Sequence, residues 1–170
     1  MQKWIIVAVA SFLLCACNDK EELTSNKQSE TGTVGFEVMD GEIIEIENIP
    51  EDEKKSILTA FDEYIASFNT KDINRYINTL SKNPHGFELE EEIETVKSVF
   101  KQYDIERVAS NTTIVRYSEN EAQVYANLNI EMKELKSNAM YLNSGRQVTV
   151  FVKEDGSWKV TRVSYMGDES

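Results

Sequence analysis

The side chains that could act as nucleophiles, general bases or soft metal ligands are few and lie in two places. The sequence contains two cysteines, Cys15 and Cys17, and one histidine, His85. We expect His85, in an Asn-Pro-His-Gly segment, to be an exposed turn residue, because no partner that would orient its ring as a base can be identified. Both cysteines follow Trp4 to Leu14, a run that is apolar except for one serine. A membrane-spanning helix needs about 20 apolar residues, so this run is typical of a cleaved signal sequence.

The end of that run, Leu14-Cys15-Ala16-Cys17, resembles the lipobox of bacterial lipoproteins. The resemblance implies a signal peptide of residues 1–16 and a lipid on Cys17 that anchors the mature chain to the cell membrane, on the extracytoplasmic side. An ordinary secretory signal cleaved after Ala16, or an uncleaved apolar stretch, is the alternative. With Cys15 removed and Cys17 lipidated, the folded part would contain no disulfide, cysteine-ligated zinc or cysteine nucleophile.

The charge of the chain excludes one class of partner. The 170 residues include 30 acidic and 18 basic side chains, a net charge of −12. We expect no nucleic-acid binding, because contacts with phosphates require a basic surface. Residues 17–35 are polar and acidic, and they predict a flexible tether that is too poor in apolar side chains to form a core. Residues 36–49 contain Asp40-Gly41 between alternating apolar residues, which predicts a small hairpin or an edge strand.

The periodicity of apolar side chains divides residues 50–168 into helices and then strands. Helical spacing predicts a long helix from about Pro50, a short second helix that ends before Asn83-Pro84, and a third helix over about residues 90–102. From about residue 104 the period is two, which predicts antiparallel strands. We expect them over residues 104–117, 122–133, 146–153 and 158–166. In the second strand one face is predicted to be buried and the other to face water.

Three N-terminal helices packed in a curved antiparallel sheet form an α+β fold. The first helix carries Phe61-Asp62-Glu63-Tyr64, a break follows at Lys71-Asp72, and the last hairpin reads Asp155-Gly156-Ser157-Trp158. With these features, residues 51–166 resemble the NTF2-like superfamily, the cone-shaped fold of nuclear transport factor 2, SnoaL-like polyketide cyclases and ketosteroid isomerase. A cystatin-like or other helix-plus-curved-sheet domain is the alternative that would give a similar pattern.

The resemblance implies a cavity inside the cone. Aromatic side chains of the helices and strands are candidates to line it, although residues with this spacing fill cores more often than they contact ligands. The candidate lining residues are Tyr64, Phe68, Tyr76, Phe100, Tyr103 and Trp158.

Enzymes of the ketosteroid isomerase type place an Asp or Glu inside the cone near a Tyr. Here Asp62, Asp104 and Glu106 lie near element ends or beside apolar stripes, where exposure is expected. The acidic cluster from Glu88 to Glu94 lacks the loop pattern of a calcium site and is expected to be a solvated helix start. We therefore predict no catalytic residue, metal site or cofactor.

The predicted function is a membrane-anchored, extracytoplasmic lipoprotein whose domain binds a small apolar ligand or a protein partner. A SnoaL-like isomerase or cyclase is one alternative, and a structural component of an envelope assembly is another. The resemblance also implies homodimerisation through the sheet, although a fold alone does not determine function.

Overall fold

The computed structural model describes residues 38–39, 42–43 and 45–168, all of which belong to one unit of the chain, residues 34–170. The predicted signal peptide, the predicted tether and Cys17 lie outside the described residues. Two short strands, β1 (Val38–Met39) and β2 (Glu42–Ile43), pair antiparallel in the segment for which a hairpin or an edge strand was predicted.

Three helices precede the main sheet. Helix α1 (Glu51–Asn69) begins after Pro50 and has three acidic residues in its first turn, where the helix dipole favours them. It ends at the predicted break, where Lys71 has a φ of 55°. Helix α2 (Ile73–Thr79) begins at Asp72, whose carboxylate accepts a hydrogen bond from the Arg75 backbone N–H at 3.1 Å. Helix α3 (Leu89–Gln102) leads directly into the sheet. In the part of the chain that is described, no helix is long and apolar enough to cross a membrane.

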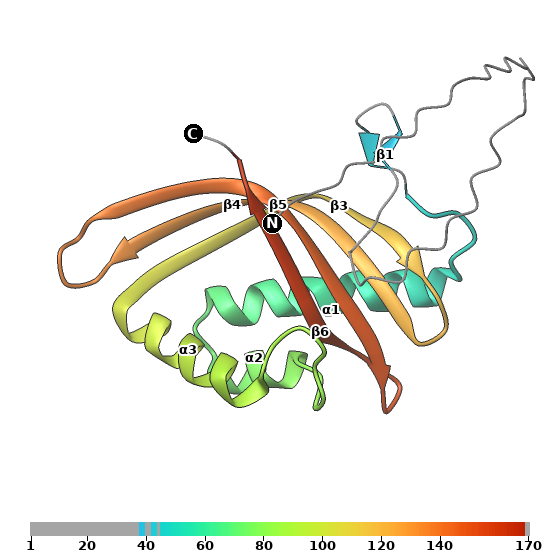
Figure 1. The fold of residues 1–170 in the computed structure, drawn as a ribbon, viewed down its shortest axis with the longest axis horizontal. Helices are drawn as coiled ribbons and strands as arrows, with labels where there is room; N and C mark the ends of the chain where they lie inside the picture. The colour runs from blue at the N-terminus through green and yellow to red at the C-terminus, as the bar shows by residue number, and fades with distance from the viewer. Residues whose placement is uncertain (1–37, 40–41, 44, 169–170) are drawn as a thin grey trace, which may run out of the picture. The chain divides into compact units, whose positions relative to one another are not determined.

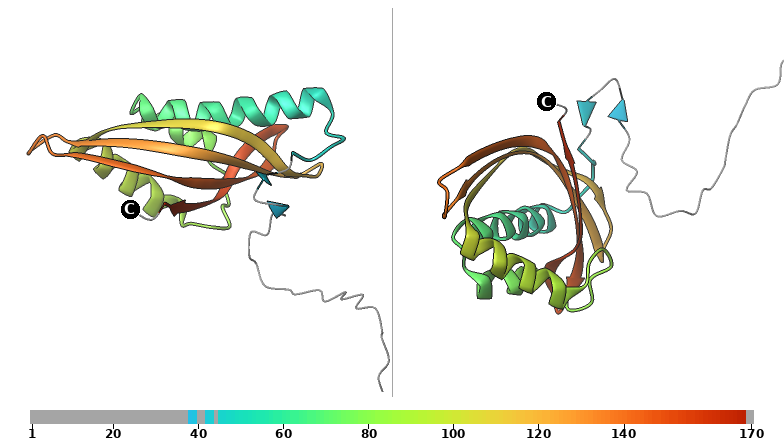
Figure 2. Two further views of the ribbon diagram at one scale, coloured as in Figure 1. Left: turned by 90° about the horizontal axis from the view of Figure 1, so that it is seen from above. Right: turned by 60° about the vertical axis from the view of Figure 1, so that its left-hand side comes forward.

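Four long strands form an antiparallel sheet in which every strand pairs with its neighbour in the sequence. They are β3 (Tyr103–Tyr117), β4 (Glu121–Glu134), β5 (Met140–Glu154) and β6 (Ser157–Gly167), in the order β3-β4-β5-β6. The sheet curves around α1, and α2 and α3 lie on the same concave side (Figures 1 and 2). The fold is an α+β cone of the predicted class.

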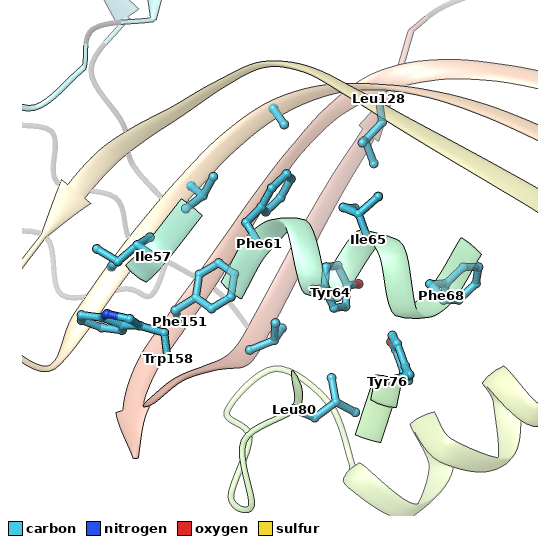
Figure 3. Close-up of a cluster of buried hydrophobic side chains, with 14 of the residues drawn as sticks. Ile57, Phe61, Tyr64, Ile65, Phe68, Tyr76, Leu80, Leu128, Phe151 and Trp158 are labelled. Atoms are coloured by element: carbon cyan, nitrogen blue, oxygen red, sulfur yellow. The ribbon is translucent and has the colours of Figure 1, made fainter. Parts of the chain in front are cut away.

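The core of the domain lies between α1 and the concave face of the sheet. Ile57 and Phe61 of α1 are fully buried, as is Phe151 of β5. Figure 3 shows that these side chains point toward one another, with Trp158 near one end of the cluster and Phe68 near the other. Burial of large aromatic side chains contributes most to the stability of such a core.

Burial in β4 differs from the prediction that one face meets water. Gln123 and Tyr125, on the outer face, are only 5% and 6% exposed. They pair directly with Val150 and Val148 of β5, so in the middle of the sheet these side chains cover one another. The alternation of polar and apolar residues therefore marked the two faces of β4 correctly but overstated the exposure of the outer one.

Strand β5 begins earlier than predicted, at Met140 instead of residue 146. Strand β6 ends at Gly167, which pairs with Gly145, so residues 140–144 of β5 pair only with β4. Side chains in this extension are exposed, and Leu142 is 78% exposed. Because residues 140–144 are all exposed, their sequence lacks the period-two pattern by which strands are recognised.

Candidate functional site

A pocket of about 670 Å³ lies between α3 and the part of the sheet that contains the extension of β5. Most of its wall is apolar or aromatic, and few polar side chains reach it, as is typical of sites for small molecules. Its apolar and aromatic lining residues are Phe68, Val96, Val99, Tyr103, Ile105, Ile130, Met132, Tyr141 and Leu142. Its polar lining residues are Glu92, Thr95, Arg107 and Asn143.

Of the six aromatic residues proposed to line a cavity, Phe68 and Tyr103 line this pocket. The Phe68 ring makes edge contacts with the rings of Phe100, at 5.0 Å between centroids, and Tyr76, at 5.6 Å. Tyr76 also packs against Tyr64 at 5.7 Å. Tyr64, Tyr76 and Phe100 thus form an aromatic cluster behind the Phe68 wall instead of lining the pocket themselves.

Trp158, the last of the six predicted lining residues, does not line this pocket. The Trp158 indole donates a hydrogen bond to Glu53 at 3.1 Å and packs near Tyr117, with 6.4 Å between ring centroids. It lies at the far end of the core cluster from Phe68 (Figure 3). Trp158 therefore stabilises the contact between the start of α1 and the sheet.

A carboxylate reaches the pocket from α3. Tyr76 is buried, with 2% of the residue exposed, and its hydroxyl donates a hydrogen bond of 2.6 Å to Oε1 of Glu92. Burial raises the pKa of Tyr76, and Tyr64 and the Glu92 charge raise it further. The phenol thus keeps its proton and acts as the donor. Oε2 of Glu92 has no hydrogen-bond partner among the described residues, so it can accept a hydrogen bond from a ligand.

Glu92 corrects the interpretation of the acidic cluster as a solvated helix start. The signal was its spacing: Glu92, Val96 and Val99 lie four and three residues apart, which places them on one face of α3. The remaining candidate acids lie elsewhere. Asp62 and Glu106 are exposed, and the exposed Asp104 forms an ion pair with Lys71.

A cation reaches the pocket from β3. The Arg107 guanidinium lies 3.5 Å from the centroid of the Phe68 ring. The Arg107 backbone is held by the Asn69 side chain, which donates a hydrogen bond to the Arg107 carbonyl at 2.8 Å and accepts one from the Arg107 N–H at 3.0 Å. Sequence reasoning missed Arg107, although it follows Tyr103 and Ile105 at the period of two that marks one face of a strand.

Among the described residues, no side chain forms a hydrogen bond or ion pair with the ring of the single histidine. His85 is exposed, and its backbone N–H donates to the Thr161 carbonyl at 3.0 Å. Within residues 38–39, 42–43 and 45–168, no group of three or more His, Cys, Asp or Glu side chains could hold a metal ion. The charged residues that line the pocket are Glu92 and Arg107.

Comparison with known proteins gives one family and a set of structural neighbours. Residues 59–167 match the family described as the anti-sigma-I factor RsgI9, C-terminal domain. No functionally curated protein matches the sequence.

Three solved structures illustrate the likeness of fold. A conserved protein from Planctomyces limnophilus has a TM-score of 0.64 and 16% identity over 70% of this chain and 100% of its own. A ketosteroid isomerase-like protein from Erwinia carotovora atroseptica has a TM-score of 0.59 and 20% identity over 71% and 99%. The hexachlorocyclohexane dehydrochlorinase LinA-type3 from Novosphingobium barchaimii has a TM-score of 0.61 and 11% identity over 69% and 88%. The domain has the NTF2-like fold, as the resemblance in sequence predicted.

Proposed function

The chain belongs to the family of the RsgI9 C-terminal domain, and from this premise we propose that it binds a small, predominantly apolar ligand outside the cytoplasmic membrane. The family takes its name from an anti-sigma factor, a regulatory protein, and this favours a binding role over turnover. The observation that carries the proposal is the pocket of about 670 Å³ with apolar walls and only four polar lining residues.

The proposed location rests on the sequence before the domain. An apolar run that ends in Leu14-Cys15-Ala16-Cys17 supports cleavage before Cys17 and transfer of lipid to its thiol. Several acyl chains on one residue hold a protein on a membrane stably, whereas a single chain gives marginal binding. Intact-mass measurement of the chain extracted from bacterial membranes should give a mature protein with a diacylglyceryl group, and Cys17→Ala should abolish both the lipid and the cleavage. An unlipidated protein of the same length from wild-type cells would contradict the anchor.

Binding can be tested by closing the pocket. Val99 lines the pocket, so a tryptophan in its place would fill part of the pocket volume. Val108→Trp places the same side chain on the outer face of β3, where Val108 is 51% exposed. We expect a neutral fluorescent apolar probe, such as 1-naphthaleneethanol, to bind the wild type and Val108→Trp alike and to lose binding to Val99→Trp. Equal binding to all three proteins would refute the pocket as the site. It would direct attention to a protein partner or to the proposed homodimer through the sheet.

The geometry of Glu92 also supports a second candidate function, an isomerase or cyclase that moves a proton. A carboxylate with one free oxygen in an apolar pocket can act as a base and take a proton from the carbon atom next to a substrate carbonyl group. The hydrogen bond from the protonated Tyr76 fixes the orientation of this carboxylate. The test is deuterium exchange at the α-carbon of a pocket-sized ketone, followed by mass spectrometry. Exchange that Glu92→Gln abolishes would establish catalysis, whereas no exchange above the buffer rate would leave binding as the function.

A further inference from the structure

We infer that Arg107 makes the pocket selective for apolar ligands that carry one carboxylate. This inference rests on the proposed binding function and names the chemical class of its ligand. It begins from an unusual placement: Arg107 lies on the face of β3 that carries Ile105, and it pairs across the sheet with Ile130. Arg107 is half-buried among these apolar walls, and the partial loss of water from a charged group is costly unless another group compensates for it.

The structure supplies only part of that compensation. In the described residues, no carboxylate oxygen lies within 4 Å of the Arg107 guanidinium, and its N–H groups make no hydrogen bond to protein. Stacking on the Phe68 ring at 3.5 Å uses the face of the guanidinium and leaves its edge free. That edge carries five donors in a planar arrangement that fits the two oxygens of a carboxylate.

The position of Arg107 is fixed before any ligand arrives. Consecutive residues at the end of α1 hold it, because Phe68 contacts its side chain and Asn69 bonds both its backbone N–H and its carbonyl. An arginine that is already oriented loses less conformational freedom on binding, so more of the interaction energy appears as affinity. This arrangement is that of a recognition residue rather than of a surface cation.

Glu92 limits the ligand to one negative charge. Its carboxylate lines the same pocket and is bonded to Tyr76, which cannot neutralise it because the phenol keeps its own proton. A second anionic group on the ligand would meet this carboxylate, and like charges at short range repel. A neutral donor, such as a hydroxyl group, would instead bond to the free oxygen of Glu92. The expected ligand is an aromatic or aliphatic monocarboxylic acid.

The experiment compares three naphthalene probes by isothermal titration calorimetry with the full mature chain in nanodiscs of zwitterionic lipid. The probes are 1-naphthaleneacetic acid, the neutral 1-naphthaleneethanol and a naphthalene dicarboxylate. With the wild type, we expect the monoacid to bind about 10- to 100-fold more tightly than the alcohol, the range for a charge-assisted, two-point hydrogen bond. The dicarboxylate should bind more weakly than the monoacid.

Substitutions then assign the preference to Arg107. Arg107→Met keeps an apolar side chain against Phe68 and should bind the acid no better than the alcohol, while Arg107→Lys should retain part of the preference. Arg116→Met removes a cation from an exposed position on the same strand and is the matched control, for which the preference should be unchanged. Thermal unfolding of each variant establishes that it is folded.

The possible failures are distinguishable. Equal affinity of the wild type for acid and alcohol, with binding still blocked by Val99→Trp, would overturn the carboxylate inference and leave the ligand pocket standing. An acid preference that persists in Arg107→Met would also overturn it, because another group would then be responsible. No binding of any probe to the wild type would refute both the pocket and the inference.

Discussion

The side-chain amide of Asn69 is expected to contribute measurably to stability because it takes the place of a neighbouring strand. Strand β3 is at the edge of the sheet, and on its free side the Asn69 amide bonds both the N–H and the carbonyl of Arg107, at 3.0 and 2.8 Å. Each such bond contributes about 0.5 to 1.5 kcal/mol net, and more when its loss leaves a buried group unpaired. Asn69→Ala should therefore lower the free energy of unfolding by about 2 kcal/mol.

For a domain of this size, about 2 kcal/mol corresponds to a fall in Tm of roughly 8 °C. The control is Asn78→Ala, which removes the same amide from an exposed position in α2 and should change the free energy of unfolding by less than about 0.5 kcal/mol. Differential scanning calorimetry and urea denaturation measure both variants. Equal Tm values for Asn69→Ala and Asn78→Ala would show that water replaces the amide at Arg107 without cost and would refute the reasoning.

Three further perturbations test the core, the sheet and an ion pair by urea denaturation. Phe61→Ala should cost about 3 to 5 kcal/mol, because the ring is fully buried. At Gly145 a Cβ would lie 2.4 Å from a backbone oxygen of β6, so Gly145→Ala should cost about 1 to 3 kcal/mol, whereas Gly167→Ala, with nothing nearer than 3.6 Å, should be neutral. The hydrogen bond from Lys153 lowers the pKa of Glu53 below its ordinary value of 4.5. The folded state thus binds fewer protons than the unfolded state, so this stabilisation is complete above that pH and is lost as the pH falls through the folded-state pKa. An unchanged difference between wild type and Glu53→Gln at about pH 7 and about pH 3 would contradict it.

The sequence predicted those parts of the fold that local residue types determine. The break between α1 and α2 falls at Lys71, and the last hairpin turns at Asp155-Gly156, whose φ values are 49° and 77°. Asp and Gly tolerate these conformations better than other residues, so the turn could be recognised without knowledge of tertiary contacts. The extension of β5 could not be recognised in this way. Pairing with β4 maintains it, and that contact is not visible in the composition of residues 140–144.

The site was less accessible to sequence reasoning because it depends on contacts between distant elements. Glu92 has several acidic neighbours in the sequence, and only its hydrogen bond to Tyr76 distinguishes it from them. In the sequence, nothing distinguishes Arg107 from the other basic residues. Its distinguishing contacts are with the end of α1, which is far away in the sequence: Asn69 and Arg107 are 38 positions apart. The aromatic candidates were easier to identify, because the period of the apolar residues along the sequence indicates which side chains are buried. It does not indicate which of them line the pocket, as Phe68 does, and which belong to the core away from it, as Trp158 does.

The strand order β3-β4-β5-β6 has a consequence for the folding kinetics of the domain. Each long strand pairs with its neighbour in the sequence, so the sheet can form as successive hairpins whose local contacts form quickly. The contact between Glu53 and Lys153, in contrast, joins residues 100 positions apart, and closure of so long a loop is entropically costly. We therefore expect the start of α1 to join the sheet after the rate-limiting step. Weakening this contact should accelerate unfolding and leave the folding rate nearly unchanged.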